Sequence, residues 1–183
     1  PIPSRGLGDV YKRQGEYDLN MENHKLGKLI NQTVKAHQDQ ARLRNISLNV
    51  QLEEDIDIVV DASAFSIILS NFVTNALKHS PSNSEILIKN DLEDDFLTTL
   101  SVIDHGKGIP KKYRDRVFER FFRVDKGRAK HSGGTGLGLA ISKHLARLMG
   151  YEVGMKPNKP NGSRFWISVN YASSEEELSL IHI

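Results

Sequence analysis

The sequence contains no cysteine among its 183 residues, which excludes disulfide bonds and thiolate metal sites. It has no apolar run of the about 18 to 20 residues that a membrane-spanning helix needs, so we expect a soluble segment without direct membrane contact. The formal net charge is only +2, and no basic stripe carries interleaved aromatic side chains, which argues against a nucleic-acid surface. An apolar fraction of 38% and a charged fraction of 26% are ordinary for a globular domain with its own core.

Both ends of the chain lack the apolar pattern of a folded element. Residues 1–14 show no helical or strand period, and residues 173–183 join an acidic run to the ending LSLIHI. These stretches resemble translated linker sequence, and ordinary frayed termini would explain them equally well. We therefore predict one domain over residues 15–172, between two tails.

The spacing of apolar residues predicts a series of helices and strands between these tails. In chain order they are an edge strand (17–20), a helix (24–44), strands 46–52 and 56–60, a helix (62–79), a hairpin of strands 84–92 and 96–104, a helix (135–149) and strands 152–156 and 164–169. Asp61 is expected to cap the second helix, and Ser80-Pro81 to end it. Paired strands with helices between them favour an α+β fold, a two-layer α/β sandwich with about three helices on one face of a mixed sheet. The connection 105–134 is long for a compact domain, which is typical of a functional lid.

The helix predicted at 62–79 carries a cluster of polar residues in the segment SNFVTNALKHSP. Asn71 and Asn75 are about one turn apart and share a face, with Lys78 next to them. Most of the remaining helix surface is apolar, so the two carboxamides need partners, because an unsatisfied buried amide costs about 1–3 kcal/mol. For this pair alone, backbone groups in the core are as good a set of partners as a ligand.

A lone carboxylate, Asp104, ends a predicted apolar strand and is followed by HGKGIP. Gly106 and Gly108 permit a flat ligand to approach the backbone closely, and the carboxylate could accept a hydrogen bond from an exocyclic amine. A plain turn in which Asp104 caps its own backbone explains the same residues. For this segment alone the plain turn is the simpler interpretation.

A run of glycines, GGTGLGL at 133–139, opens the helix predicted at 135–149. Such a run costs conformational entropy, which is hard to justify at a helix start unless the backbone must approach something closely. Exposed N–H groups at a helix N-terminus make a ready phosphate site. The segment is not a Walker A loop, because the Lys–Ser/Thr pair is missing, nor a dinucleotide fingerprint, because its spacing differs. We therefore favour a phosphate-binding turn.

These segments together resemble a known family, the GHKL ATP-binding fold, and within it the sensor histidine kinases. NFVTNALKH resembles the N box, DHGKGI the first glycine box, FERFFR (118–123) the F box, GGTGLGL the glycine box before the last helix, and GSRFWI (162–167) the closing strand motif. The resemblance covers about residues 17–170, and its specificity comes from the order of the motifs. It implies a Bergerat-type sandwich with an ATP lid at about 107–134.

The resemblance also implies ATP and Mg²⁺ as cofactors. Asn75, with Asn71 beside it, would hold Mg²⁺, which prefers oxygen ligands. Lys78 would meet phosphate charge, and Asp104 would read the adenine amine. The implied cofactor-binding residues are Asn71, Asn75, Lys78, His79, Asp104, Gly106, Gly108, Ile109, Gly134, Thr135, Gly136, Leu137, Gly138 and Leu139. The implied catalytic residues are Asn75, Lys78 and Arg123; Arg120 is the alternative to Arg123 at the γ-phosphate, and Phe118, Phe121 and Phe122 are expected to anchor the lid.

One position separates the branches of this family. Its ATP-hydrolysing members carry a glutamate four residues before the Mg²⁺-binding asparagine, as a general base for water. Here that position is Asn71, which cannot take a proton, so the ATPases and the related serine kinases are disfavoured. A degenerate nucleotide-binding module that regulates a partner stays as a second alternative, against which the intact glycines, Asp104 and Asn75 argue.

The resemblance finally implies a histidine as the phosphoryl acceptor. None of the seven histidines lies in an acceptor motif such as His-Glu followed by Thr-Pro. The expected partners are therefore the histidine-containing dimerisation domain of the same parent protein and a downstream response regulator. The expected location is the cytoplasm, in a parent that a membrane anchor elsewhere could hold.

Overall fold

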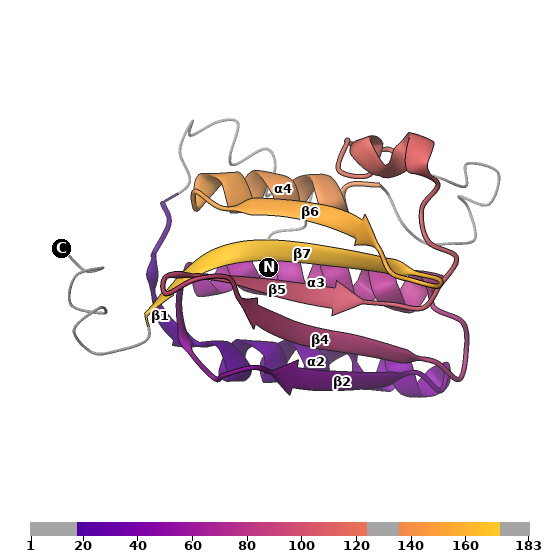
Figure 1. Ribbon diagram of the computed structural model, residues 1–183, viewed down its shortest axis with the longest axis horizontal. Helices are drawn as coiled ribbons and strands as arrows, with labels where there is room; N and C mark the ends of the chain where they lie inside the picture. The colour runs from indigo at the N-terminus through magenta and orange to yellow at the C-terminus, as the bar shows by residue number, and fades with distance from the viewer. Residues whose placement is uncertain (1–17, 124–135, 173–183) are drawn as a thin grey trace.

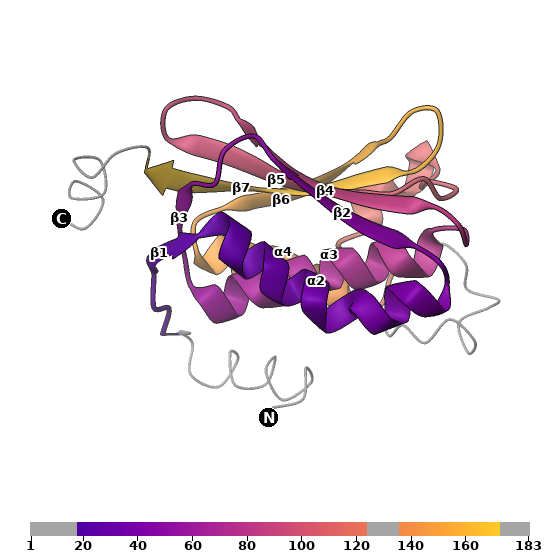
Figure 2. The same cartoon turned by 90° about the horizontal axis from the view of Figure 1, so that it is seen from below.

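The computed structural model describes residues 18–123 and 136–172. Within these ranges three α-helices lie on one side of a single mixed sheet, as Figures 1 and 2 show. They are α2 (Leu26–Leu43), α3 (Ala62–His79) and α4 (Gly138–Leu148), with a short 3-10 helix, η1 (Lys111–Arg116). The predicted two-layer α/β sandwich is confirmed. No helix in the described part of the chain is long and apolar enough to cross a membrane.

In the described residues the sheet has seven strands, of which β7 is the longest. The strands are β1 (Glu22–Lys25), β2 (Ser47–Leu52), β3 (Asp57–Val60), β4 (Glu85–Leu92), β5 (Leu97–Ile103), β6 (Glu152–Pro157) and β7 (Ser163–Ala172). Their order is β1-β3-β7-β5-β4-β2, and β6 also pairs with β7. Among the strands of residues 18–123 and 136–172, only the β2–β4 pair is parallel. Strand β7 therefore pairs with both β5 and β6, and β5 leads into the predicted Asp104 turn.

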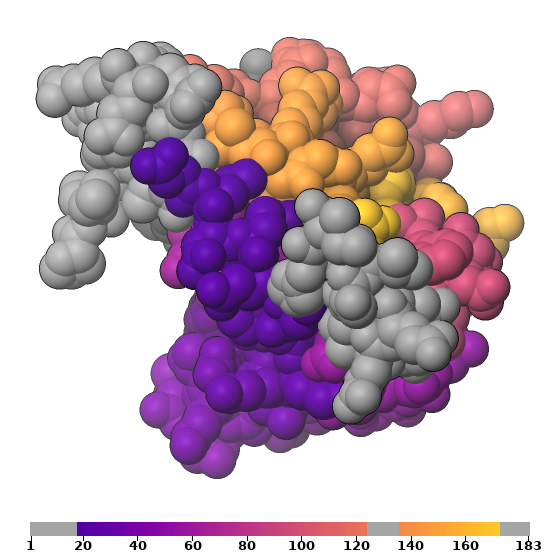
Figure 3. All heavy atoms as spheres, turned by 90° about the vertical axis from the view of Figure 1, so that its left-hand side faces the viewer, coloured from indigo at the N-terminus to yellow at the C-terminus, as the bar shows by residue number. Residues whose placement is uncertain are grey.

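The predicted edge strand at 17–20 is wrong for the described residues 18–20, which are not in a strand. The strand instead lies at 22–25 and pairs antiparallel with β3, with Lys25 opposite Asp57. Asp61 explains the shift, because its Oδ2 accepts a hydrogen bond of 2.9 Å from the backbone N–H of Asn20 and fixes that residue before the strand begins. Figure 3 shows this N-terminal segment, in indigo, beside the orange α4–β6 region.

Helix α3 has the boundaries that its sequence predicts. Asp61 is the N-cap, and its Oδ1 accepts a hydrogen bond of 2.9 Å from the N–H of Ala64. The helix ends at His79, because Ser80 adopts an extended conformation before Pro81. Its apolar residues are buried, and the Phe72 ring lies 5.7 Å from the ring of Phe165 on β7. The helix thus lies in the centre of the core, and its polar side chains are confined to one face.

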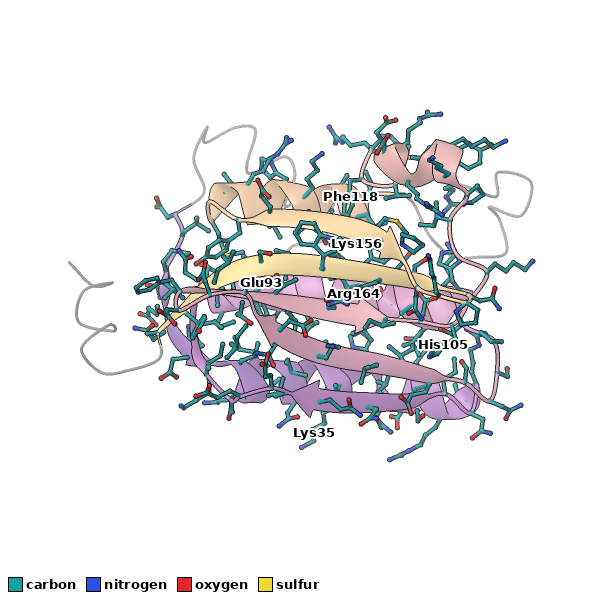
Figure 4. The ribbon with its side chains drawn as sticks, viewed as in Figure 1. Lys35, Glu93, His105, Phe118, Lys156 and Arg164 are labelled. Atoms are coloured by element: carbon teal, nitrogen blue, oxygen red, sulfur yellow. The ribbon has the colours of Figure 1, made fainter. Side chains whose placement is uncertain are left out.

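Strand β7 alternates between the two faces of the sheet. Ser163 and Phe165 are buried on the helix side, whereas Arg164 points to the other face, where Figure 4 labels it. There its Nη2 lies 2.6 Å from Oδ2 of Asp91, and its Nε donates to Oγ of Ser101 at 2.9 Å. This polar pairing supports the register of β7 against β5, in which Arg164 lies opposite Ile103, and with it the position of Ser163.

Candidate nucleotide site

The polar face of α3 contains two asparagines in different surroundings. Asn71 donates from Nδ2 to the carbonyl oxygen of Gly138 at 2.8 Å and to Oγ of Ser142 at 3.0 Å. Asn75 is half-buried, and its side chain forms no hydrogen bond with the described part of the chain. The core therefore accounts for the amide nitrogen of Asn71, while the carboxamide of Asn75 is left for a ligand.

Lys78 and His79 form the last turn of α3. The pKa of Lys78 is lowered by desolvation and then by the nearby Arg123 guanidinium. The pKa of His79 is lowered by desolvation and then by Lys78, although both side chains retain contact with solvent. Lys78 and Arg123 are like charges close enough to repel each other, which is the arrangement that an anion would stabilise. The Arg120 guanidinium instead lies 6.0 Å from the centroid of the Phe121 ring.

Asp104 is 2% exposed, and within the described residues only one of its two carboxylate oxygens is bonded. Its Oδ1 accepts hydrogen bonds from the N–H groups of Gly106 (2.9 Å) and Ser163 (3.2 Å). No group in the described residues bonds Oδ2. Burial raises the pKa of Asp104 against the opposing effect of these two bonds. The turn predicted as the simpler interpretation is therefore present, and it leaves a second oxygen for a donor from a ligand.

Two glycines allow the Asp104 segment to lie against its neighbours. A Cβ on Gly106 would stand 2.3 Å from the carbonyl oxygen of His79, at the end of α3. A Cβ on Gly162, in the turn between β6 and β7, would stand 1.9 Å from the carbonyl oxygen of Asp104. The segment thus lies between the end of α3 and the β6–β7 turn, which brings Asp104 to the same end of the molecule as Lys78.

The segment after Asp104 leads into η1 and the F box. Gly108 has a φ of +76°, and Ile109 packs partly buried against the core. The Phe118 ring lies 6.0 Å from that of Phe165, and the Phe122 ring lies 5.6 Å from that of Tyr113. Figure 4 labels Phe118 on this segment. Both phenylalanines pack partly buried against the core, so the predicted anchoring of the lid is confirmed for them.

Phe121 does not anchor the lid, contrary to prediction. Its side chain is 67% exposed, and its φ of 62° is unusual for a bulky residue. The cause is a backbone contact: its N–H donates to the carbonyl oxygen of Gly136 at 2.9 Å. A Cβ on Gly136 would stand 2.8 Å from the Phe121 Cα, so this close crossing requires the glycine.

The last helix begins later than predicted, at Gly138. Gly133, Gly134 and Thr135 lie outside the described residues, as does the predicted lid from 124 onward. Leu137 precedes the helix without a side-chain cap, and its first turn holds no acidic residue. The first N–H groups of α4 therefore remain for an anion. The hydrogen bond from Asn71 to Gly138 places this helix start beside the polar face of α3. Leu139 packs partly buried against the core.

The site therefore combines a half-buried carboxamide, two cations, a buried carboxylate and an uncapped helix start. Residues 60–173 match the family described as "Histidine kinase-, DNA gyrase B-, and HSP90-like ATPase". The chain belongs to this family. The expected fold and the expected ATP-binding type of domain are both confirmed by this match.

Relatives within this family are sensor kinases. WalK of Bacillus subtilis (strain 168), a sensor histidine kinase, is 36% identical over 126 residues, which is 68% of this chain and 21% of WalK. SenX3 of Mycolicibacterium smegmatis, a sensor-like histidine kinase, is 33% identical over 141 residues, 77% of this chain and 36% of SenX3. The structure of full-length ShkA in complex with AMPPNP matches with a TM-score of 0.77 and 27% identity, covering 92% of this chain and 35% of ShkA. The chain is a histidine kinase-type catalytic domain that spans only part of such proteins.

Two residues that hold Asp104 in this site were not predicted from the sequence. The side chain of Asn158 donates to the carbonyl oxygen of Asp104 at 3.0 Å. The backbone N–H of Ser163 donates to Oδ1 of Asp104 at 3.2 Å. Ser163 lies in the segment GSRFWI, which the sequence marks as a closing strand motif, so a signal was present. Asn158 has no such signal, because only folding brings the β6–β7 turn onto Asp104.

Proposed function

We propose that this domain binds Mg²⁺-ATP and positions its γ-phosphoryl group for transfer to a histidine. The acceptor would be supplied by a dimerisation domain that this chain does not contain. The observation that carries the proposal is Asn71, which stands where ATP-hydrolysing relatives have a glutamate. Its amide nitrogen bonds Gly138 and Ser142, so it serves as a structural link and not as a base for water.

The residues fit a nucleotide from base to phosphate. Oδ2 of Asp104 would accept a hydrogen bond from the adenine amine, with Gly106 and Gly108 at the wall of the base pocket. Lys78, Arg123 and the N-terminus of α4 would bind the phosphates. The lid expected at about 107–134 stays a prediction, since residues 124–134 lie outside the described part of the chain. Phosphoryl transfer depends mainly on positioning and charge neutralisation, which these groups can provide without a base.

The donor set also fits Mg²⁺. This ion prefers oxygen ligands and keeps several waters, so it can be held by one or two protein oxygens together with phosphates. Asn75 offers a carboxamide oxygen that is unbonded in the described residues, and Asn71 still offers its Oδ1, because the two bonds it forms use only Nδ2. When bound, the ion would neutralise phosphate charge.

A dimerisation domain that carries the acceptor histidine would need a docking surface near Arg123. Phe121 is 67% exposed, and the half-buried Leu137 follows the Gly136 to which it is bonded. We propose that this apolar surface, Phe121 with Leu137, contacts the dimerisation domain. A phosphohistidine formed there would pass its phosphoryl group to a response regulator. Such a reaction uses ATP, so we place the domain in the cytoplasm.

A titration with Mg²⁺-ATP tests the site. Asn75→Ala should weaken binding at least about tenfold, because it removes a ligand to the metal and phosphates. The matched control is Thr74→Ala, since the Thr74 hydroxyl bonds only the α3 backbone, at 3.2 Å to the carbonyl oxygen of Asn71. Equal binding by the wild type and both variants would contradict the site. Rapid ATP hydrolysis by the chain alone would favour an ATPase instead, and no binding by the wild type would favour a degenerate regulatory module.

A second assay tests the acceptor. The chain alone should form no phosphohistidine, and it should phosphorylate a separately supplied dimerisation domain of a sensor kinase. Phe121→Ser should reduce this transfer while leaving the affinity for Mg²⁺-ATP unchanged. Robust phosphohistidine formation by the chain alone would overturn the proposal.

A further inference from the structure

We propose that Asn158, in the turn between β6 and β7, is a positioning residue that determines how well Asp104 selects adenine over other purines. The inference rests on the proposed function, because it assumes that Asp104 reads the adenine amine. Asn158 itself would not touch the nucleotide.

The side chain of Asn158 reaches from its own turn onto the backbone that carries Asp104. Its Nδ2 donates to the carbonyl oxygen of Asp104 at 3.0 Å, and it also lies 3.4 Å from Nδ1 of His105. The backbone N–H of Asn158 donates to the carbonyl oxygen of Gly162 at 3.0 Å, which closes the turn. Figure 4 shows His105, labelled, at the end of the sheet where this turn lies.

The backbone N–H and the Oδ1 of Asp104 are held by backbone groups of Gly106 and Ser163. Its N–H donates to the carbonyl oxygen of Ser163 at 2.9 Å, and its Oδ1 accepts from Gly106 and Ser163. The carbonyl oxygen of Asp104 is held by a side chain instead, because it accepts a hydrogen bond from Nδ2 of Asn158. Without that donor the peptide between Asp104 and His105 can rotate. Rotation would shift the Gly106 N–H that holds Oδ1, so the carboxylate would turn. Its second oxygen, Oδ2, which has no partner in the described residues, would move with it.

The position of Oδ2 affects one class of ligand more than another. Adenine presents an amine, a donor, to a carboxylate acceptor, whereas hypoxanthine presents a carbonyl oxygen at the same position. A site built to accept a hydrogen bond discriminates strongly against a ligand that lacks the donor. A displaced Oδ2 should therefore weaken binding of ATP and leave that of inosine triphosphate almost unchanged.

The β6–β7 turn contains a matched control. Asn161 is exposed in the same turn, and only its backbone oxygen accepts a hydrogen bond, at 3.4 Å from Nδ2 of Asn158. Asn161→Ala changes the same residue type without touching Asp104. Asn158→Ala removes the donor, and Asn158→Asp keeps the size of the side chain but cannot donate to a carbonyl oxygen.

Calorimetric titrations of the whole chain with Mg²⁺-ATP and Mg²⁺-inosine triphosphate provide the test. Loss of one hydrogen bond should weaken ATP binding by Asn158→Ala about three- to tenfold and leave inosine triphosphate unchanged. The preference for ATP should fall by the same factor, in Asn158→Asp as well, and stay at the wild-type value in Asn161→Ala. Adding Asn158→Ala to Asp104→Asn should cause no further loss of preference, because both act on Oδ2.

The outcomes separate this inference from the proposed function. Equal weakening of both nucleotides by Asn158→Ala, or an unchanged preference, would overturn the inference. If Asp104→Asn loses the preference for ATP while both Asn158 variants keep it, only the role of Asn158 fails. If Asp104→Asn itself keeps the wild-type preference, the proposed role of Asp104 fails first.

Discussion

The amide nitrogen of Asn71 lies 2.8 Å from the carbonyl oxygen of Gly138, and this bond joins the helix of the N box to the first turn of α4. The same nitrogen lies 3.0 Å from Oγ of Ser142, which itself donates to the Gly138 carbonyl at 3.0 Å. Three polar groups thus satisfy one another at the point where two elements of the nucleotide site meet. Both the stability of the domain and the geometry of its phosphate-binding end depend on this junction.

Asn71→Asp should destabilise the domain, because a carboxylate cannot donate to Gly138 or Ser142 and would face a carbonyl oxygen. We expect a loss of about 1–3 kcal/mol in the free energy of unfolding, measured by denaturant titration near neutral pH. Asn31→Asp makes the same chemical change on an exposed position of α2 and should have little effect. Equal stability of Asn71→Asp and the wild type would show that the junction contributes nothing.

Asp104→Asn should abolish most binding of Mg²⁺-ATP and make the domain more stable above the acidic range. The pKa of Asp104 is raised from its ordinary value of 3.8, mainly by burial, so the folded chain holds this proton to higher pH than the unfolded chain. Stability therefore falls as pH rises through the window above 3.8, and it stays lower beyond it. The neutral amide does not titrate, so the stability of the variant should not show this decrease with rising pH. Thermal unfolding from pH 4 to pH 8 measures it, and parallel curves for both proteins would contradict the expectation.

Gly106→Ala should lose nucleotide binding because the new Cβ would stand 2.3 Å from the carbonyl oxygen of His79. Either α3 or the Asp104 segment must then move, and both carry residues of the site. Gly138→Ala serves as a control for stability: its Cβ would lie 3.4 Å from the Asn71 carboxamide, an ordinary contact, and alanine favours a helix. We expect a lower melting temperature for Gly106→Ala alone. Wild-type ATP affinity in that variant would mean that the two segments do not need this close approach.

Arg44→Met should destabilise the end of α3 that carries Lys78. The Arg44 guanidinium donates to the carbonyl oxygens of Leu77 and Ser80, which would otherwise lack partners at the helix C-terminus. We expect a loss of about 1–2 kcal/mol in the free energy of unfolding. Arg42→Met is the control, because the Arg42 side chain is 72% exposed and pairs only with Asp39 at 3.5 Å. A loss of the same size in both variants would argue against the capping role.

Local signals in the sequence determined helix α3 and the order of the motifs. The carboxylate of Asp61 caps the helix three residues on, Pro81 ends it, and the apolar residues between them repeat at helical spacing. All of these interactions act within a few residues, so they can be read without knowledge of the fold. The same holds for the polar face of Asn71 and Asn75, and for the order of the glycine-rich segments that identifies the family.

Contacts between distant segments were decided only by the tertiary structure. Asn71 had two possible kinds of partner, and the packing of α4 against α3 supplied one of them for its amide nitrogen. Phe121 looked like a core residue, but a backbone bond to Gly136 turned its side chain outward. Nothing in the sequence around Asn158 indicates its role, because its partner Asp104 is 54 positions away and only the folded β6–β7 turn brings the two together. Hydrophobic spacing specifies which face of an element is buried, whereas a hydrogen bond between turns depends on atoms that only the assembled sheet brings within reach.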